Sequence, residues 1–189
     1  MAQTLLERIA TKAAKANIAQ RLDSIKWFRS VMRGISLSQR TLFRNHLVES
    51  KTSRGVGRMI AFRYEPKMKE TLPHYDTFPL VIPIREVSGG FHGLNLHYLS
   101  PQSRTAFLGK LATFVNNDKY DESTRIRVTW GLLKSGVLRE YATPTIKHYR
   151  RSQIRSQMIV FHPEEWVMAV FLPTARFVGQ SQRAVWRSY

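Results

Sequence analysis

Hydrophobic positions change their period along the chain and divide its 189 residues into three parts. In residues 1–50, apolar residues recur in steps of three and four, which is the spacing along one face of an α-helix. The clearest run comprises Ile18, Leu22, Ile25, Phe28, Met32 and Ile35. Gly34 is placed to end that helix, and SLSQ (residues 36–39) has the form of a capping box for a second helix through Leu47. The pattern therefore predicts a helical arm.

Residues 59–98 have the alternation and composition of β-strands. We expect strands in MIAFRY, PLVIPI and FHGLNLHYL, and a hairpin turn at VSGG between the last two. Pro83 has no N–H to donate, so its strand must lie at a sheet edge or carry a bulge. A long loop is expected over residues 65–77, in which Asp76 caps a turn. Three short strands of this kind predict a small SH3-like barrel or an antiparallel β-meander.

Residues 100–189 have a mostly helical pattern. SPQS and TPTI each place a serine or threonine before a proline, which is a typical helix start, so helices are expected from Ser100 and from Thr143. A second apolar stripe runs over residues 126–137, and QMIVF has the composition of a strand. HPEEW opens a further helix, and Trp186 is expected to anchor a C-terminal tail or short helix.

Together these elements predict an α+β fold, in which a small SH3-like barrel or antiparallel β-meander is packed by several helices and follows an N-terminal helical arm. The expected division is an arm over residues 1–50, a linker over residues 51–58 and a globular domain over residues 59–189. The linker assignment rests on small residues, glycines and cations without periodicity. No window approaches eighteen uncharged apolar residues, so no membrane span is expected.

The charge of the chain is strongly unbalanced, with 30 Lys+Arg against 13 Asp+Glu and a formal net charge of +17. Such a charge repels itself, so an anionic partner is expected, either nucleic acid or an acidic protein surface. Most of the cations are arginine, which favours bidentate contacts with phosphate or carboxylate. The absence of cysteine excludes disulfides, thiolate metal ligands and thiol nucleophiles.

The strongest basic constellation lies in the helix expected from Thr143. There, Lys147, Arg151 and Arg155 fall at positions i, i+4 and i+8. With Arg150 beside them, these cations would form a ridge that can follow a phosphate backbone. A face of merely solvated charges is the alternative interpretation. The other cations that we assign to contacts are Arg125 and Arg127 for nucleic acid, and Arg29, Arg33, Arg40 and Arg44 of the arm for a partner.

Signals of enzymatic chemistry are weak. The six histidines show no helical i, i+4 pairing, and a zinc site without cysteine needs about three converging His or carboxylate ligands. We therefore expect no metal and no cofactor. No nucleophile elbow or phosphate-binding glycine loop occurs in the sequence, so an enzyme is not expected. The carboxylates cluster in two places. A turn with a helix cap explains Asp118, Asp121 and Glu122, and the start of a helix explains Glu164 and Glu165.

Several long segments of the chain resemble those of a known family. They are FRYEPKMKETLPHYDTFPLVIPI, GFHGLNLHYLSPQSR, NNDKYDESTRIRVTW, IKHYRRSQIRSQMIVFHPEEWVMAVFLPTARF and VWRSY. The family is a group of small virion structural proteins of T-even-type tailed phages, often labelled DNA end protector, and the resemblance covers about Arg58 to the C-terminus. It implies a non-enzymatic part of the particle, made in the host cytoplasm and built into the head, neck, tail or baseplate. No functional residues carry over with it.

The leading hypothesis is a virion structural protein that contacts DNA, including the packaged genome end, through an arginine-rich surface. Two alternatives remain open at this point. The first is an architectural neck, tail or baseplate component whose basic surface and helical arm bind acidic neighbouring subunits. The second is a DNA-processing enzyme that depends on Asp121 or Glu122.

Overall fold

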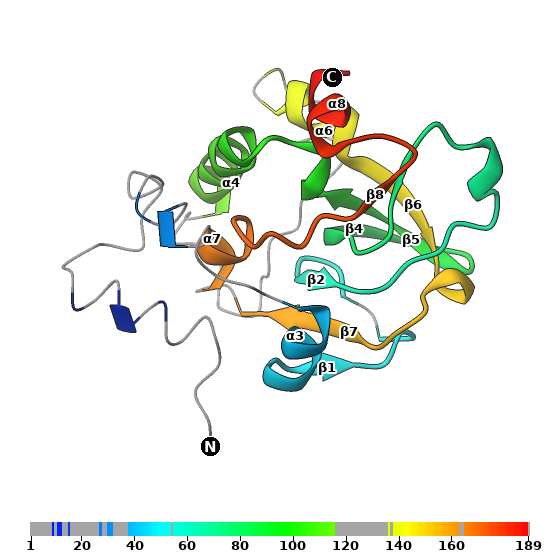
Figure 1. Cartoon of the computed structure of the whole chain (residues 1–189), viewed down its shortest axis with the longest axis horizontal. Helices are drawn as coiled ribbons and strands as arrows, with labels where there is room; N and C mark the ends of the chain where they lie inside the picture. The colour runs from blue at the N-terminus through cyan, green and yellow to red at the C-terminus, as the bar shows by residue number, and fades with distance from the viewer. Residues whose placement is uncertain are drawn as a thin grey trace.

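The computed structural model describes residues 38–53, 55–115, 138–162 and 165–188, together with residue 136 and a few positions nearer the N-terminus (residues 9, 11, 12, 15, 27, 30 and 31). In this part of the chain the fold is mixed helix and sheet, as predicted (Figure 1). A six-stranded sheet forms its centre, in the order β1-β7-β2-β4-β5-β6. Among the described residues the sheet is open, with β1 and β6 as its edges, and does not close into the predicted SH3-like barrel.

Every neighbouring pair in the sheet is antiparallel. The strands are β1 (Val48–Glu49), β2 (Met59–Ala61), β4 (Leu80–Val87), β5 (Gly90–Asn95), β6 (Ile146–Arg150) and β7 (Met158–Phe161). A separate two-stranded sheet pairs β3 (Tyr75–Asp76) with β8 (Phe177–Val178). The expected strands in MIAFRY, PLVIPI, FHGLNLHYL and QMIVF are thus confirmed, each with shorter or shifted bounds.

Helices accompany the sheet, and α4, α6 and α8 lie together on one side of it (Figure 1). The α-helices are α3 (Gln39–Asn45), α4 (Pro101–Val115), α6 (Arg139–Thr145), α7 (Trp166–Ala169) and α8 (Gln182–Arg187). Short 3-10 turns are η2 (Lys69–Thr71), η3 (Leu96–Tyr98) and η4 (Arg151–Gln153). Trp186 donates a hydrogen bond from its indole N–H to the His97 carbonyl at 2.9 Å, which anchors α8 as expected.

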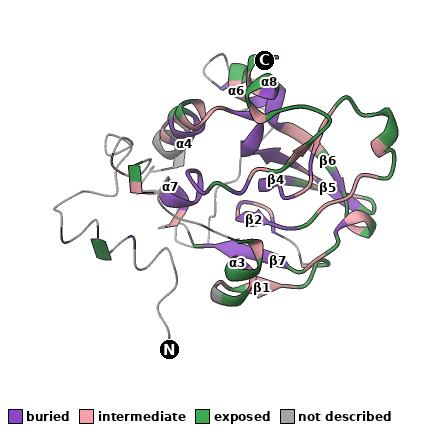
Figure 2. Ribbon diagram, viewed as in Figure 1, coloured by how far each residue is buried: buried purple, intermediate pink, exposed green. Residues whose placement is uncertain are grey.

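The central strands of the sheet consist mostly of buried residues (Figure 2), and their side chains form two separate clusters. On one face, Ile82 and Leu94 belong to the same cluster as Phe107 of α4 and Ala169 of α7. The smaller cluster on the other face contains Phe62, Phe91 and Tyr149 among other buried residues. Alternation along each strand produces these two faces, because successive side chains point in opposite directions.

Pro83 lies inside the sheet and not at its edge. Its strand β4 pairs with β2 on one side and β5 on the other, and the β4–β5 register shifts between Pro83 and Arg85. The bulge alternative is therefore confirmed. The three-residue β2 does not extend far enough to need an N–H from Pro83, and the Pro83 carbonyl accepts from Gly57 N–H at 2.9 Å. The hairpin at VSGG is also formed, with Gly89 at φ 71°.

Helix starts were predicted with mixed success. Ser100 Oγ accepts from Ser103 N–H at 3.1 Å, which confirms the cap of α4. The cap of α3 is Ser38, whose Oγ accepts from Thr41 N–H at 3.1 Å, and the helix ends at Asn45 before reaching Leu47. The two serines of SLSQ offer similar side chains, and local sequence did not distinguish between them.

The prediction of a helix that starts at Thr143 is wrong. α6 ends at Thr145, and residues 146–150 form the edge strand β6 along β5. Backbone pairing with β5 and burial of Tyr149 against Phe91 favour the strand. Local pattern missed this because tertiary pairing overrides a short helical spacing.

Part of the expected arm belongs to the main sheet. α3 and β1 lie within residues 38–49, Leu42 is buried in the larger cluster, and Val48 pairs with Ile159 of β7. Ile9 is also buried in that cluster. Of the rest of the arm before Ser38, the structure describes residues 11, 12, 15, 27, 30 and 31, and Trp27 and Val31 pack against the same cluster. The apolar stripe of residues 126–137 lies outside the described residues apart from Gly136. The division into arm, linker and domain remains a prediction. In the described part of the chain, no helix has the length and apolar character needed to cross a membrane.

Candidate nucleic-acid interface

The cations predicted to form one helical ridge lie on a strand, on a 3-10 turn and in the segment after that turn. Lys147 is in strand β6, Arg151 is in the turn η4, and Arg155 follows η4. β6 ends at Arg150, so the backbone changes from a strand to a 3-10 turn between Lys147 and Arg155, and the helical spacing that would have aligned their side chains does not apply. Their environments must therefore be considered separately.

Arg151 is a structural cation. Its guanidinium makes two hydrogen bonds to the Glu86 carboxylate, at 2.8 and 2.7 Å, and donates to the carbonyls of Lys51 at 2.7 Å and Ser53 at 2.9 Å. It also lies over the ring of Phe91, 5.4 Å from the centroid. Only 18% of its side chain is exposed. Arg151 thus holds residues 51–53 against the β4–β5 hairpin, and its charge is offset by Glu86.

Lys147 occupies a half-buried position beside aromatic rings. Its Nζ lies 4.1 Å from the centroid of Tyr98, which is a cation–π geometry. Burial lowers the pKa of the Lys147 ammonium, because the charged form loses hydration.

Arg150 and Arg155 are exposed and lie where two distant segments of the chain meet. Arg150 N–H donates to the Tyr64 hydroxyl at 3.2 Å, and Arg155 N–H donates to the Arg63 carbonyl at 2.8 Å. Tyr64 also forms a bridge with Ile154. These bonds place residues 63–69 beside residues 147–155. We refer to these two segments together as the basic junction.

The basic junction contains one acid and seven cations. Glu65, the acid, accepts from Lys69 at 2.7 Å and from Arg155 at 3.2 Å. Lys69 and then Arg155 lower the pKa of the Glu65 carboxyl. Both pairs are exposed to solvent and contribute little to stability, but they leave the surface with a net positive charge. The cations are Arg63, Lys67, Lys69, Lys147, Arg150, Arg151 and Arg155.

Helix α3 adjoins this surface through Arg63. The Arg63 Nε donates to Gln39 Oε1 at 3.1 Å, and its guanidinium lies 5.7 Å from the ring centroid of Phe43. Arg40 and Arg44 are exposed on the same helix. The other predicted contact residues, Arg29, Arg33, Arg125 and Arg127, lie outside the described residues.

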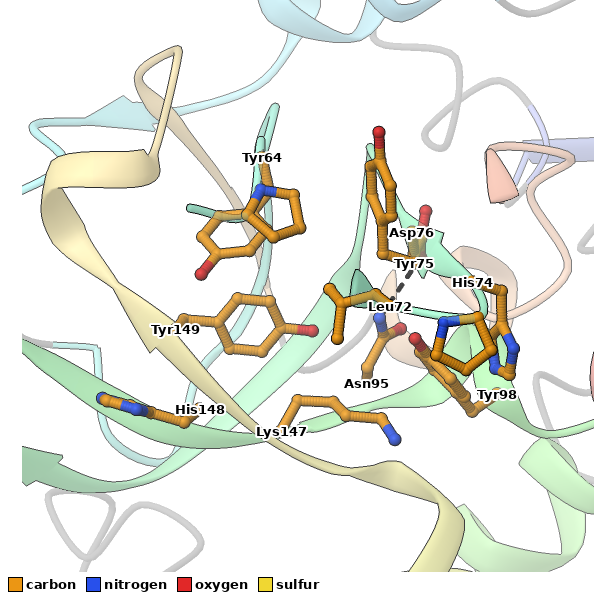
Figure 3. Close-up of a pocket in the computed structure, with 12 residues that line it drawn as sticks. Tyr64, Leu72, His74, Tyr75, Asp76, Asn95, Tyr98, Lys147, His148 and Tyr149 are labelled. Carbon is orange, nitrogen blue, oxygen red and sulfur yellow. Dashed lines mark hydrogen bonds between the residues drawn. The ribbon is translucent and has the colours of Figure 1, made fainter. Parts of the chain in front are cut away.

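A cavity of about 280 Å³ opens next to the basic junction (Figure 3). Lys147 and Tyr149 project into it from β6, whereas His148 projects the other way. The loop after Tyr64 forms the opposite wall, where Leu72 points toward the centre. The lining residues are Tyr64, Pro66, Leu72, Pro73, His74, Tyr75, Asp76, Asn95, Tyr98, Lys147, His148 and Tyr149.

The floor of the cavity rests on a buried polar network centred on Asp76. Asp76 Oδ2 accepts from His97 Nδ1 at 2.7 Å and from Asn95 Nδ2 at 3.3 Å, and Oδ1 accepts from Phe78 N–H at 3.0 Å and Arg176 N–H at 3.2 Å. The turn cap expected of Asp76 is therefore confirmed by the Phe78 bond. Four hydrogen bonds satisfy the carboxylate without solvent.

His97 and Arg104 extend this network below the cavity. His97 Nε2 lies 3.2 Å from the Thr174 hydroxyl, which gives Asp76, His97 and Thr174 the order of a catalytic triad. His97 is fully buried, however, and no substrate can reach this arrangement, so we assign it a structural role. Burial lowers the pKa of His97, although Asp76 opposes the shift.

Arg104 is buried and satisfied by backbone carbonyls. Its guanidinium donates to Leu99 at 2.9 Å, Val170 at 3.0 Å and His97 at 3.3 Å. Burial lowers the pKa of Arg104 to about 10, so it remains charged at neutral pH. This role could not be predicted from the sequence, because an isolated arginine in a helix is usually a surface residue.

The described residues contain no group of three metal-ligating side chains that could hold an ion. Of the carboxylates considered from the sequence, Glu165 accepts from His162 N–H at 2.8 Å, at the start of the segment leading to α7. Glu164 and the cluster Asp118, Asp121 and Glu122 lie outside the described residues.

Exposed arginines beside an aromatic cavity define a surface suited to a polyanion with flat rings, which is the chemistry of nucleic acid. Comparison with known families agrees with this class. The model of the family described as phage T4 terminal DNA protecting protein matches residues 1–189, and the chain belongs to this family. The match confirms the resemblance and extends it over residues 1–57. No curated protein and no solved structure matches the chain.

Proposed function

We propose that this protein binds the ends of linear phage DNA and shields them, with the basic junction holding the phosphates. The observation that carries the proposal is the pairing of residues 63–69 with residues 147–155, which gathers six cations around Glu65, in addition to Arg151, whose charge Glu86 offsets. Family membership supports DNA ends as the target. The protein acts as a non-enzymatic component associated with the virion or the infected cell.

The contact residues differ from the ridge predicted from the sequence. Arg150, Arg155 and Arg63 present charge to solvent at the junction, while Arg151 is engaged by Glu86. Duplex DNA carries about one charge per 1.7 Å of axis, so a few guanidinium groups on one surface can each replace a condensed counterion. Arg40 and Arg44 of α3 are placed to lengthen this contact.

Protection of a linear duplex against an exonuclease tests the proposal. Wild-type protein should delay digestion, and its affinity for a short duplex should fall with rising salt. The double variant Arg150→Gln/Arg155→Gln should protect less, and its slope of log affinity against log salt should be smaller by about 1 for each lost phosphate contact. Arg139→Gln is the matched control, because Arg139 is an exposed arginine on α6 outside the junction.

The outcomes separate this proposal from its alternatives. Absence of binding at low salt would contradict it. Tight binding to an acidic virion protein, with none to DNA, would support the architectural alternative in which the basic surface and arm contact neighbouring subunits. Metal-dependent cleavage that is lost in Asp121→Asn or Glu122→Gln would support a DNA-processing enzyme.

A further inference from the structure

The cavity beside the basic junction is built from some of the same residues as the junction itself. Tyr64 and Pro66 come from one segment of the junction, and Lys147, His148 and Tyr149 come from the other. A nucleic-acid strand whose phosphates lie on the exposed arginines would therefore pass directly over the mouth of the cavity.

The chemistry of the cavity suits a nucleobase. Its lining contains four tyrosines and two histidines, together with the polar side chains of Asp76, Asn95 and Lys147. A volume of about 280 Å³ lies near the lower limit of ligand pockets, which span about 300–1,000 Å³, and corresponds to one small ring-bearing group. Aromatic walls accept the flat face of any base by stacking, without need for sequence readout.

The aromatic walls are fixed before any ligand arrives. Tyr149 packs edge-on against Tyr64, with centroids 4.9 Å apart, and stacks on Phe91 at 5.4 Å. Tyr98 packs edge-on against Phe177 at 5.1 Å. Tyr149 and Tyr98 are buried and keep the walls rigid, whereas the half-buried rings of Tyr64 and Tyr75 are the ones on which a base can stack at little cost in conformational entropy.

Charge in the cavity also favours a nucleotide. Lys147 brings a cation inside the walls, over the ring of Tyr98. The acid of the lining, Asp76, is 4% exposed and already accepts four hydrogen bonds, so it presents little negative charge to the cavity. Lys147 can thus meet the phosphate or a base oxygen of a nucleotide that enters.

We propose that this cavity captures the unpaired terminal nucleotide of a DNA strand and so gives the protein its preference for ends. A base inside a duplex must lose its partner and its stacking on both sides before it can enter, whereas a terminal base loses stacking on one side only. The inference rests on the proposed function, because it explains how a phosphate-binding surface selects ends over continuous duplex.

The test compares two short duplexes that carry a one-nucleotide overhang. One overhang has its base and the other is abasic, so their charges are equal. Wild-type protein should bind the overhang with the base more tightly, by a factor within the about 5- to 150-fold range of one aromatic–base stack. A hairpin-closed duplex without ends should bind still more weakly.

Two variants locate the effect in the cavity. Lys147→Met removes the cation while keeping a long apolar side chain, and Leu72→Glu places a charge at an exposed position of the mouth. Both should bring the ratio of affinities for the two overhangs close to 1. Leu47→Glu is the control, since Leu47 is exposed next to the opposite edge strand β1, and it should keep the wild-type ratio.

The results distinguish this inference from the function on which it rests. Equal wild-type affinity for the two overhangs, or an unchanged ratio in both Lys147→Met and Leu72→Glu, would refute terminal-base capture while leaving end protection intact. If the wild-type protein bound no DNA, both would fail. Leu72→Glu keeps the test valid if Lys147→Met does not fold, because the Leu72 side chain is 42% exposed.

Discussion

Arg151 offers a sharp distinction between a cation that holds the fold and one that binds DNA. The sequence places it at the centre of the basic ridge, whereas the structure gives it two bonds to Glu86 and two to backbone carbonyls. Arg151→Ala should therefore destabilise the protein and leave the intrinsic affinity of the folded form for DNA nearly unchanged.

The magnitude follows from these contacts. A partly exposed bidentate ion pair contributes about 1 kcal/mol, each hydrogen bond from the charged group to a carbonyl contributes about 1 kcal/mol after discounting for exposure, and the contact with the Phe91 ring adds about 0.5 kcal/mol. The free energy of unfolding should fall by about 3.5 kcal/mol. Urea denaturation measures this loss, and salt titration of DNA binding under native conditions measures the affinity.

Two comparisons make the assay decisive. Glu86→Gln breaks the same ion pair from the other side, so it should also lower stability without weakening DNA binding. Arg150→Gln should do the opposite, because Arg150 is exposed and its backbone N–H, not its side chain, contacts Tyr64. The reasoning would be refuted if Arg151→Ala retained wild-type stability and lost as much DNA affinity as Arg150→Gln.

Three further predictions concern the scaffold beneath the site. Arg104→Met should lower the free energy of unfolding by at least about 3 kcal/mol, measured by urea denaturation, because three buried carbonyls lose their donor. Burial lowers the pKa of His97 in the folded protein, so the unfolded chain takes up a proton more readily than the folded protein. Thermal unfolding should therefore show full stability above the unfolded pKa of about 6.5 and a loss of stability below it. This loss of stability should be smaller in His97→Gln. Gly90→Ala should destabilise by about 2–3 kcal/mol, because its Cβ would meet the Tyr149 carbonyl, whereas Gly89→Ala, at positive φ with no atom nearby, should cost only about 1 kcal/mol; equal losses would contradict this account.

Local chemistry was sufficient to predict several elements. The β4–β5 hairpin follows from a glycine pair between two apolar runs, the bulge near Pro83 from a missing N–H, and the start of α4 from Ser100 before a proline. Each of these depends on interactions within a few residues. The apolar run in QMIVF was likewise sufficient by itself to predict the strand β7.

The candidate site could be predicted only in part. Arg150 and Arg155 were chosen from their spacing and are exposed in the structure, but the helix that justified the choice is a strand followed by a turn. Arg63 and Tyr64 were not selected, although the run FRYEPKMK carries three cations that could have drawn attention to them. The cavity gave no sequence signal, because its lining comes from four separate parts of the chain.

The sequence by itself determined that the protein is strongly basic and free of cysteine, that it contains both helices and strands, and that its segments resemble those of one phage family. Tertiary structure alone decided which cations face solvent. Residues 63–69 meet residues 147–155 through hydrogen bonds of backbone N–H groups between positions about ninety apart, and Arg151 meets Glu86 across 65 positions. Local periodicity cannot encode such contacts, because pairing at a sheet edge depends on what the rest of the chain places beside it.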